Sequence, residues 1–302
     1  MEQLSGLDGW FLAMETRTVF GHVGSVCIID AMGARSPLTL EHLTRVIESR
    51  LPLVPLLRRR LVTVPLGLDH PYWIEDPDFD IEFHVRELAL PAPGHDGQLT
   101  EQVARLHARP LDRGRPLWEL YLIHGLSGGR AAIYSKIHHA AIDGISGGDI
   151  LTALFDVSPQ GRELPAVDVF EGERPPDPLW LLARSAVALA RQPLQVVRVA
   201  TDLARSIPLI ANAIGPPLAQ RLAGRDQADL LSQTGLRAPV TPFNAPLSPH
   251  RRWSFTDLPL AEVKTLRGGG NRAGLTVNDV VMALCAGALR RWLQLHDALP
   301  VA

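Results

Sequence analysis

The sequence predicts an α+β fold in which strands outnumber helices. Residues 19–30 are rich in β-branched side chains and predict a strand, and residues 118–126 and 130–139 predict two more strands joined by the turn Ser127-Gly128-Gly129. Shorter strands are expected around residues 59–65, 71–75 and 81–89. Apolar residues at helical spacing predict helices over residues 37–51, 98–108 and 145–157. Together these elements form an N-terminal domain over residues 1–160.

The remaining chain divides into a linker over residues 161–249 and a shorter segment over residues 250–302. The linker begins with a stretch dense in proline, glycine and acidic residues. After it we expect a strand at 252–257, a short helix near 259–267 and a long helix from Thr276 to about Leu295. Asp279 follows Thr276 by three residues, which is the spacing of a helix capping box.

Within the linker, the apolar segment 179–223 carries arginines at seven-residue intervals. They are Arg184, Arg191, Arg198 and Arg205. This spacing places them in one stripe on a helix, which Pro193 is expected to kink or break. A helix that spans a bilayer would not carry a charge every two turns. Two interpretations stay open: a connecting helix with solvated arginines, and an amphipathic helix lying on a membrane surface.

The composition restricts the partners and the compartment. With 30 Lys+Arg against 32 Asp+Glu, the net charge of −2 provides no basic surface for nucleic acid. Cys27 and Cys285 are too few for a disulfide framework or a zinc site, and each lies in an apolar run where a buried thiol is expected. The N-terminus lacks the basic and apolar regions of a secretory signal, so cytoplasm is the expected compartment.

The segment that carries chemistry runs from His138-His139 to Asp143-Gly144, where a predicted strand meets a predicted helix. Because strand side chains alternate, only one of the two histidines can face a given cavity, which argues against a metal site. A histidine with an intrinsic pKa near ~6.5 is suited to general-base catalysis. Asp143 has two possible roles, orienting the imidazole or holding the turn, and we favour the second. Gly144 is expected to permit close backbone approach or a positive φ.

The HHAAIDG segment resembles the HHxxxDG motif of the CoA-dependent acyltransferase superfamily. More specifically, the chain is similar to the bacterial wax ester synthase/diacylglycerol acyltransferase family. Further residues carry this resemblance: Leu4-Ser5, Asp8, Phe11-Leu12, the segments 55–61 and 69–86, Arg115-Pro116-Leu117-Trp118 and Asn278-Asp279.

The resemblance implies a mixed sheet flanked by helices, as in chloramphenicol acetyltransferase, with the N-terminal domain complete and a second similar domain only begun in residues 250–302. It implies transfer of a long-chain acyl group from acyl-CoA to diacylglycerol or to a fatty alcohol. His139 matches the general base that takes the proton of the acceptor hydroxyl, and the oxygen then attacks the thioester directly. No cofactor is implied, because acyl-CoA is a substrate.

The resemblance also suggests roles for supporting residues. His138 matches a supporting histidine and Asp143 a structural aspartate, for which Arg58 is the expected salt-bridge partner. Gly144 and Asn278 are expected to line the substrate site. Arg58 is alternatively part of a solvated strand edge, and Asn278 alternatively a polar group at a helix N-terminus. Trp118 is expected to pack beneath the site.

The implied partners are acyl-CoA and a diacylglycerol or long-chain alcohol, without nucleic acid. The arginine stripe adds the expectation of peripheral attachment to the inner membrane face or to lipid inclusions. A second function stays open, because relatives usually continue through a complete second domain: a truncated, non-catalytic lipid- or acyl-CoA-binding protein. Condensation of acyl groups bound to carrier proteins is less favoured, since no carrier domain is present in the sequence.

Overall fold

The structure is a computed structural model that describes residues 1–30, 37–142, 147–156, 158, 162, 171–188, 239–267 and 275–300. The chain divides into two compact units. The first unit comprises Met1–Pro193 with Ser248–Ser254, and the second comprises Leu194–Leu247 with Phe255–Ala302. The domain boundaries predicted near residues 160 and 249 stay predictions.

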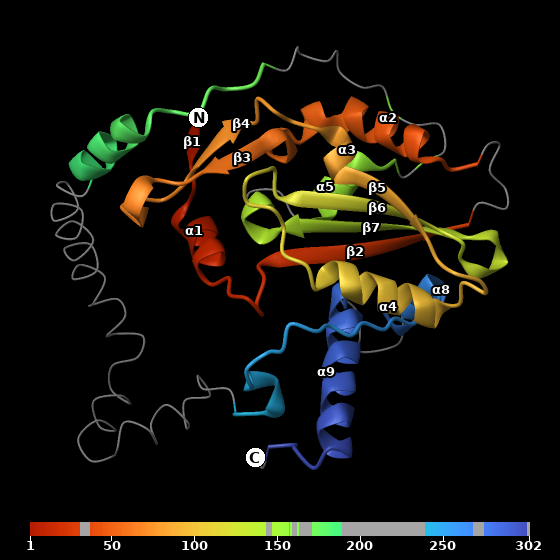
Figure 1. The fold of residues 1–302 in the computed structure, drawn as a ribbon. Helices are drawn as coiled ribbons and strands as arrows, with labels where there is room; N and C mark the ends of the chain where they lie inside the picture. Colours follow the sequence, from red (N-terminus) through yellow and green to blue (C-terminus); the bar gives the residue numbers. More distant parts are fainter. Residues whose placement is uncertain are drawn as a thin grey trace, which may run out of the picture. The chain divides into compact units, whose positions relative to one another are not determined.

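The first unit contains two sheets (Figure 1). Their strands are β1 (Glu2–Gln3), β2 (His22–Ile29), β3 (Arg59–Val62), β4 (Tyr72–Glu75), β5 (Val85–Ala89), β6 (Trp118–His124) and β7 (Ala131–His138). The larger sheet has the order β2-β7-β6-β5 and the smaller one the order β1-β4-β3. In the larger sheet β5 and β6 run parallel and the other pairs antiparallel, so the predicted mixed α+β fold is confirmed.

The helices of the first unit are α1 (Gly6–Ala13), α2 (Leu40–Arg50), α3 (Ile81–His84), α4 (Asp96–His107), α5 (Gly147–Leu154) and a helix over residues 178–188. Three of them, α2, α4 and α5, agree with the helices predicted from the apolar periodicity. Short 3-10 turns are η1 (Leu51–Leu53), η2 (Pro55–Arg58), η3 (Pro65–Gly67), η4 (Ser127–Gly129) and η5 (His139–Ala141). The first half of the strand predicted at 81–89 is instead α3, which starts where the Asp80 carboxylate accepts a hydrogen bond from the Glu82 amide at 3.0 Å.

Helices pack on both faces of the larger sheet. On one face, α2 and α5 cover the alternate residues of β6 and β7 in one apolar core. Its fully buried members include Ile47, Leu57, Trp118, Leu120, Leu122 and Ile150. On the other face lies α4 (Figure 1), which contributes the buried Leu99, Val103 and Leu106. The sheet is thus a buried platform that ends at His138.

The α4 side of the sheet also holds a buried ion pair. The Lys136 ammonium lies 2.9 Å from Glu119 and donates to the carbonyls of Leu106 and Arg109 at 3.2 and 3.1 Å. Burial lowers the pKa of Lys136, although Glu119 favours its charged form. Because all three ammonium protons have acceptors, this lysine ties the end of α4 to β7 two residues before His138.

The second unit contains η6 (Pro242–Asn244), α8 (Leu260–Arg267) and α9 (Val277–Leu295). The predicted capping box is confirmed, because the Thr276 hydroxyl accepts from the Asp279 amide at 3.1 Å while Asp279 accepts from the Thr276 amide at 2.7 Å. Phe243 contacts Trp292 with ring centroids 4.8 Å apart. The end of α9 therefore packs against η6.

Two further expectations from the sequence are wrong. Residues 252–257 form no strand, because none of them pairs with a neighbouring strand among the described residues. Both cysteines are exposed instead of buried. Cys27 lies on β2, which forms an edge of its sheet, and Cys285 lies on a largely exposed stretch of α9.

Only the first arginine of the predicted stripe lies within the described residues. Arg184 donates to the Tyr72 hydroxyl at 3.0 Å, and its guanidinium lies 5.4 Å from the ring of Trp180. Arg191, Arg198, Arg205 and the kink at Pro193 lie outside the described residues. Across the part of the chain that the structure describes, no helix has both the length and the apolar character to cross a membrane.

Candidate active site

The two histidines lie at the point where β7 ends. His138 is the last residue of the strand and is 1% exposed, whereas His139 begins η5 and is exposed. Their backbone is held from both sides. The His138 amide donates to Leu117 at 2.9 Å, and the His139 amide donates to the Gly21 carbonyl at 2.7 Å. The two rings therefore have different surroundings, because the strand ends between them.

His138 is held by hydrogen bonds at both ring nitrogens. Its Nδ1 accepts from the Ala140 amide at 3.0 Å, so this nitrogen carries no proton. Its Nε2 therefore carries the proton and donates to Glu15 Oε1 at 3.1 Å. Because both nitrogens are engaged, His138 is a neutral positioning group with no free lone pair.

Glu15 forms the centre of a small polar cluster beside His138. Its carboxylate also accepts from the Gly21 amide at 2.9 Å and from Arg113 at 2.6 Å. Burial alone would raise the pKa of Glu15, but the hydrogen bonds from His138, Arg113 and Gly21 outweigh it and lower the pKa to about 2. This anionic group ties the segment after α1 to the end of β7. We found no local signal for it in the sequence, because its partners are distant along the chain.

His139 has a different environment, with an open imidazole edge. Its ring stacks on Phe11 with centroids 4.2 Å apart and planes 13° apart. Among the residues that the structure describes, none hydrogen-bonds to either ring nitrogen of His139. The stack fixes the plane of the ring while leaving a nitrogen lone pair available to accept a proton.

This arrangement requires a glycine at position 21, because there is no room for a side chain. A Cβ atom at this position would lie 2.8 Å from His138 Nε2 and 3.3 Å from the Phe11 carbonyl oxygen. Any side chain here would therefore displace His138 from Glu15. The sequence offers no sign of this requirement, since Gly21 lies inside a stretch read as an ordinary strand.

The other predicted site residues are placed as follows. Asp143 and Gly144, and with them the expected pairing of Arg58 with Asp143, lie outside the described residues. Arg58 ends η2, half-buried, and its carbonyl accepts from the Asp76 amide at 2.9 Å. Asn278 is exposed in the first turn of α9, within the second unit.

Trp118 is buried beneath the turn that carries Arg58. Its Nε1 donates to the Leu57 carbonyl at 2.6 Å, and its ring stacks on His84 with centroids 4.5 Å apart. His84 in turn hydrogen-bonds through Nδ1 to the Trp118 carbonyl at 2.7 Å. The indole therefore links β6 to η2 and α3, which is a packing position.

Comparison with known proteins decides the family. The family described as the wax ester synthase/diacylglycerol acyltransferase catalytic domain matches residues 4–281. The chain belongs to this family. The resemblance inferred from the sequence motifs is thereby confirmed, and the matched residues include both histidines and Asn278.

Relatives of this acyltransferase-family chain are found in mycobacteria. A protein of Mycobacterium tuberculosis strain CDC 1551, provisionally named a diacylglycerol O-acyltransferase, is 37% identical over 305 residues, covering 100% of this chain and 57% of that protein. Another from strain H37Rv, named in the same provisional way, is 33% identical over 310 residues, covering 99% of this chain and 62% of its own length. The chain thus spans about three fifths of these relatives.

A solved structure resembles the fold. The wax ester synthase/diacylglycerol acyltransferase of Marinobacter aquaeolei VT8 matches with a TM-score of 0.63 and 27% sequence identity. The match covers 99% of this chain and 62% of that one. The mixed sheet with flanking helices is therefore the fold expected of an acyltransferase-family chain.

Proposed function

We propose that this chain catalyses transfer of a long-chain acyl group from acyl-CoA to the hydroxyl of a diacylglycerol or of a fatty alcohol. His139 takes the proton of the acceptor hydroxyl, and the oxygen attacks the thioester carbonyl carbon. The carbon–sulfur bond then breaks, and the CoA thiolate leaves and takes the proton from His139. The products are an ester and free CoA, without a covalent enzyme intermediate.

The observation that carries this proposal is the open imidazole of His139 in a family of acyltransferases. A general base needs a lone pair within reach of the acceptor hydroxyl, and His139 is exposed with its ring plane set by Phe11. His138 has both nitrogens occupied, so its role is to hold the backbone of the motif. We assign it to positioning.

The residues outside this pair keep the roles that the family resemblance implies. In the proposal Arg58 pairs with Asp143 to hold the turn after His139, and Gly144 and Asn278 line the substrate site. Neither Cys27 nor Cys285 has a part in the reaction, because direct transfer needs no enzyme nucleophile. Acyl-CoA and the alcohol are the only small molecules that the reaction requires.

The deciding experiment is a thiol-release assay on the purified 302-residue chain. Palmitoyl-CoA is supplied as donor, with dioleoylglycerol or hexadecanol as acceptor. We expect acceptor-dependent thiol release that falls by about a hundredfold or more in His139→Ala. Arg45→Ala is the control, because Arg45 is an exposed α2 residue paired with Glu41.

Two results would contradict the proposal. Unchanged turnover in His139→Ala would remove His139 as the base. Binding of palmitoyl-CoA without any transfer by the wild-type chain would favour the alternative, a non-catalytic lipid- or acyl-CoA-binding protein.

Peripheral attachment to a lipid surface is part of the same proposal. The support is the exposed apolar group formed by Leu179, Trp180 and Val187 on the helix over residues 178–188. Co-sedimentation of the chain with phosphatidylglycerol vesicles tests it, and we expect Trp180→Glu to reduce the bound fraction. Equal binding by both proteins would remove this helix from the proposal.

A further inference from the structure

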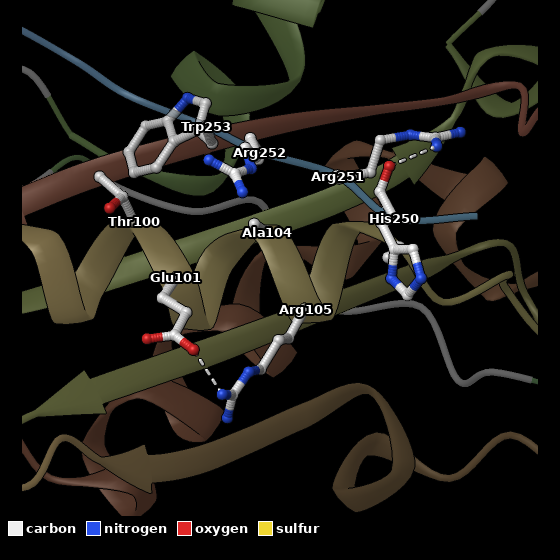
Figure 2. Close-up of a pocket in the computed structure, with 9 residues that line it drawn as sticks. Thr100, Glu101, Ala104, Arg105, His250, Arg251, Arg252 and Trp253 are labelled. Carbon is white, nitrogen blue, oxygen red and sulfur yellow. Dashed lines mark hydrogen bonds and ion pairs between the residues drawn. The ribbon is translucent and has the colours of Figure 1, made fainter. Parts of the chain in front are cut away.

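A cavity lies in the first unit, and neither His138 nor His139 lines it. It has a volume of about 500 Å³ and lies between α4 and residues 250–253 (Figure 2). It is lined by Thr100 and Ala104 of α4 and by Ala108, the C-cap of that helix, which recur every four residues and therefore lie on one side of it. Their small side chains leave the space that a ligand would occupy.

The cavity is positively charged. Three arginines line it, Arg105, Arg251 and Arg252, against a single glutamate, Glu101. Glu101 is already paired with Arg105 one helical turn away, so its charge is balanced within α4. This local excess of positive charge occurs in a chain whose net charge is −2, and it favours an anionic ligand.

The two neighbouring arginines on the opposite wall have different roles. Arg251 donates to the carbonyls of Ser248 and His250 at 2.7 and 3.1 Å and also to the carbonyl of Thr18, so it holds the wall in place. Arg252 is exposed and forms no hydrogen bond or ion pair with any residue that the structure describes. Its guanidinium is therefore available to an anion.

Beside Arg252 lies an aromatic side chain. Figure 2 shows the Trp253 indole and the Arg252 guanidinium on the same side of α4, above Thr100 and Ala104. An indole face stacks on a nucleobase, and a guanidinium binds phosphate oxygens with two parallel hydrogen bonds. A ligand that carries both phosphates and a base satisfies both groups at once.

We propose that this cavity binds the nucleotide end of CoA, with Arg252 on the phosphates and Trp253 against the adenine. The inference rests on the proposed function, in which acyl-CoA is the donor. The inference adds the place where the protein binds the nucleotide of acyl-CoA, the end of the donor that does not react.

The wall of this cavity is connected to the candidate active site through a short stretch of backbone. Arg251 donates to the carbonyl of Thr18 and lies 5.8 Å from the ring of Phe20. The next residue, Gly21, accepts the His139 amide at 2.7 Å. In CoA the pantetheine arm separates the nucleotide from the thioester, so a nucleotide site need not touch His139.

Calorimetric titration of the full 302-residue chain with CoA tests the inference. We expect Arg252→Ala to weaken binding about ten- to hundredfold, Arg252→Glu to weaken it further, and Trp253→Ala to weaken it about tenfold. Arg45→Ala, which removes an exposed arginine far along the chain, is expected to bind CoA as the wild type does. Pantetheine, which lacks the nucleotide, is expected to bind equally weakly to all of these proteins.

The controls distinguish CoA binding at this cavity from acyl transfer and from binding of other anions. CoA binding needs no acyl transfer, so a wild-type chain that binds CoA through Arg252 but has no turnover contradicts the proposed function alone. Normal CoA affinity in both Arg252→Glu and Trp253→Ala, or no CoA binding by the wild type, overturns the inference. Binding of phosphatidylglycerol vesicles that depends on Arg252, without CoA binding, would assign the cavity to lipid headgroups and likewise overturn it.

Discussion

Glu15 accepts a hydrogen bond at 3.1 Å from Nε2 of His138, a residue 123 positions later in the chain. The contact fixes the neutral tautomer of His138, whose other ring nitrogen accepts from Ala140. It also sets the start of η5 and with it the backbone of His139. A carboxylate that no motif indicates thus positions the residue proposed as the base.

The first prediction concerns Glu15 and acid stability. Its folded-state pKa of about 2 lies below the ordinary value of 4.5, so its stabilising contribution is complete above pH 4.5 and is lost as the pH falls towards 2. We expect Glu15→Gln to lower the free energy of unfolding at pH 7 by about 2–3 kcal/mol. Urea denaturation at pH 7, 4 and 3 measures this, and the difference between the two proteins should shrink with acid. A constant difference would contradict the contact.

The second prediction separates the two histidines by stability. His138→Ala removes a buried ring and leaves the Glu15 carboxylate without one donor, so we expect a loss of about 2–4 kcal/mol. His139→Ala removes an exposed ring and its stack on Phe11, which should cost about 1 kcal/mol or less. Thermal denaturation compares them. If His139→Ala is the more destabilised protein, the assignment of a structural His138 is wrong.

The third prediction concerns the space at Gly21. A Cβ atom there would lie 2.8 Å from His138 Nε2. We therefore expect Gly21→Ala to lower the free energy of unfolding by about 1–3 kcal/mol and also to reduce the rate of acyl transfer. Gly6→Ala is the matched control, because a Cβ atom at Gly6 meets nothing within 4 Å. The control should match or exceed wild-type stability in the same denaturation experiment. Equal stability of both variants would show that His138 can move aside.

The fourth prediction concerns two buried histidines that the proposed reaction does not use. Burial lowers the pKa of both His22 and His84 to about 4. His22 Nδ1 and His84 Nε2 have no hydrogen-bond partner among the described residues, so a second proton on either ring would be a buried donor without an acceptor. Near pH 4 to 6.5 the folded state binds fewer protons at these rings than the unfolded state does. The free energy of unfolding is therefore highest above pH 6.5 and falls as the pH approaches 4, by about 3 kcal/mol for each histidine.

Two substitutions preserve the existing hydrogen bonds while removing the titration. His22 forms its hydrogen bond through Nε2, to the carbonyl of His107 at 2.8 Å, and a glutamine side-chain amide can form the same hydrogen bond. His84 forms its hydrogen bond through Nδ1, to the carbonyl of Trp118 at 2.7 Å, and an asparagine side-chain amide can form the same hydrogen bond. The double variant His22→Gln/His84→Asn should therefore lose less stability than the wild type between pH 6.5 and 4. Equal pH dependence would show that these rings do not titrate as described.

Local sequence patterns were sufficient to predict elements that are defined by residues close together in the chain. Strands β6 and β7, helix α4 and the Thr276–Asp279 cap of α9 were all predicted from short segments. The short α1 was not predicted, because Gly6 and Gly9 interrupt it and its aromatic residues follow no clear helical spacing. Its signal was present, since Ser5 caps the helix by accepting from the Asp8 amide at 3.2 Å.

The candidate site was predicted only where it is continuous in sequence. His138 and His139 are adjacent to each other and begin the motif on which the resemblance to the family rests. Glu15 and Arg113 reach the site through pairing of distant segments, and single-residue patterns carry no information about such contacts. The predicted burial of Cys27 is wrong for a related reason, because an apolar run does not tell whether a strand lies at the centre or the edge of its sheet.

The pairing of β2 with β7 has a consequence for the order in which the molecule assembles. His22 lies opposite His138 in this ladder, so more than a hundred residues must be synthesised before β2 finds its neighbour. Closing so long a loop is slow compared with forming a helix or a hairpin. During translation, β2 and its exposed Cys27 therefore stay unpaired until β7 has been synthesised, and the Gly21 carbonyl meets the His139 amide only after that point. Assembly of the proposed site therefore requires this long loop to close, because Gly21, the residue before β2, holds the backbone of His139.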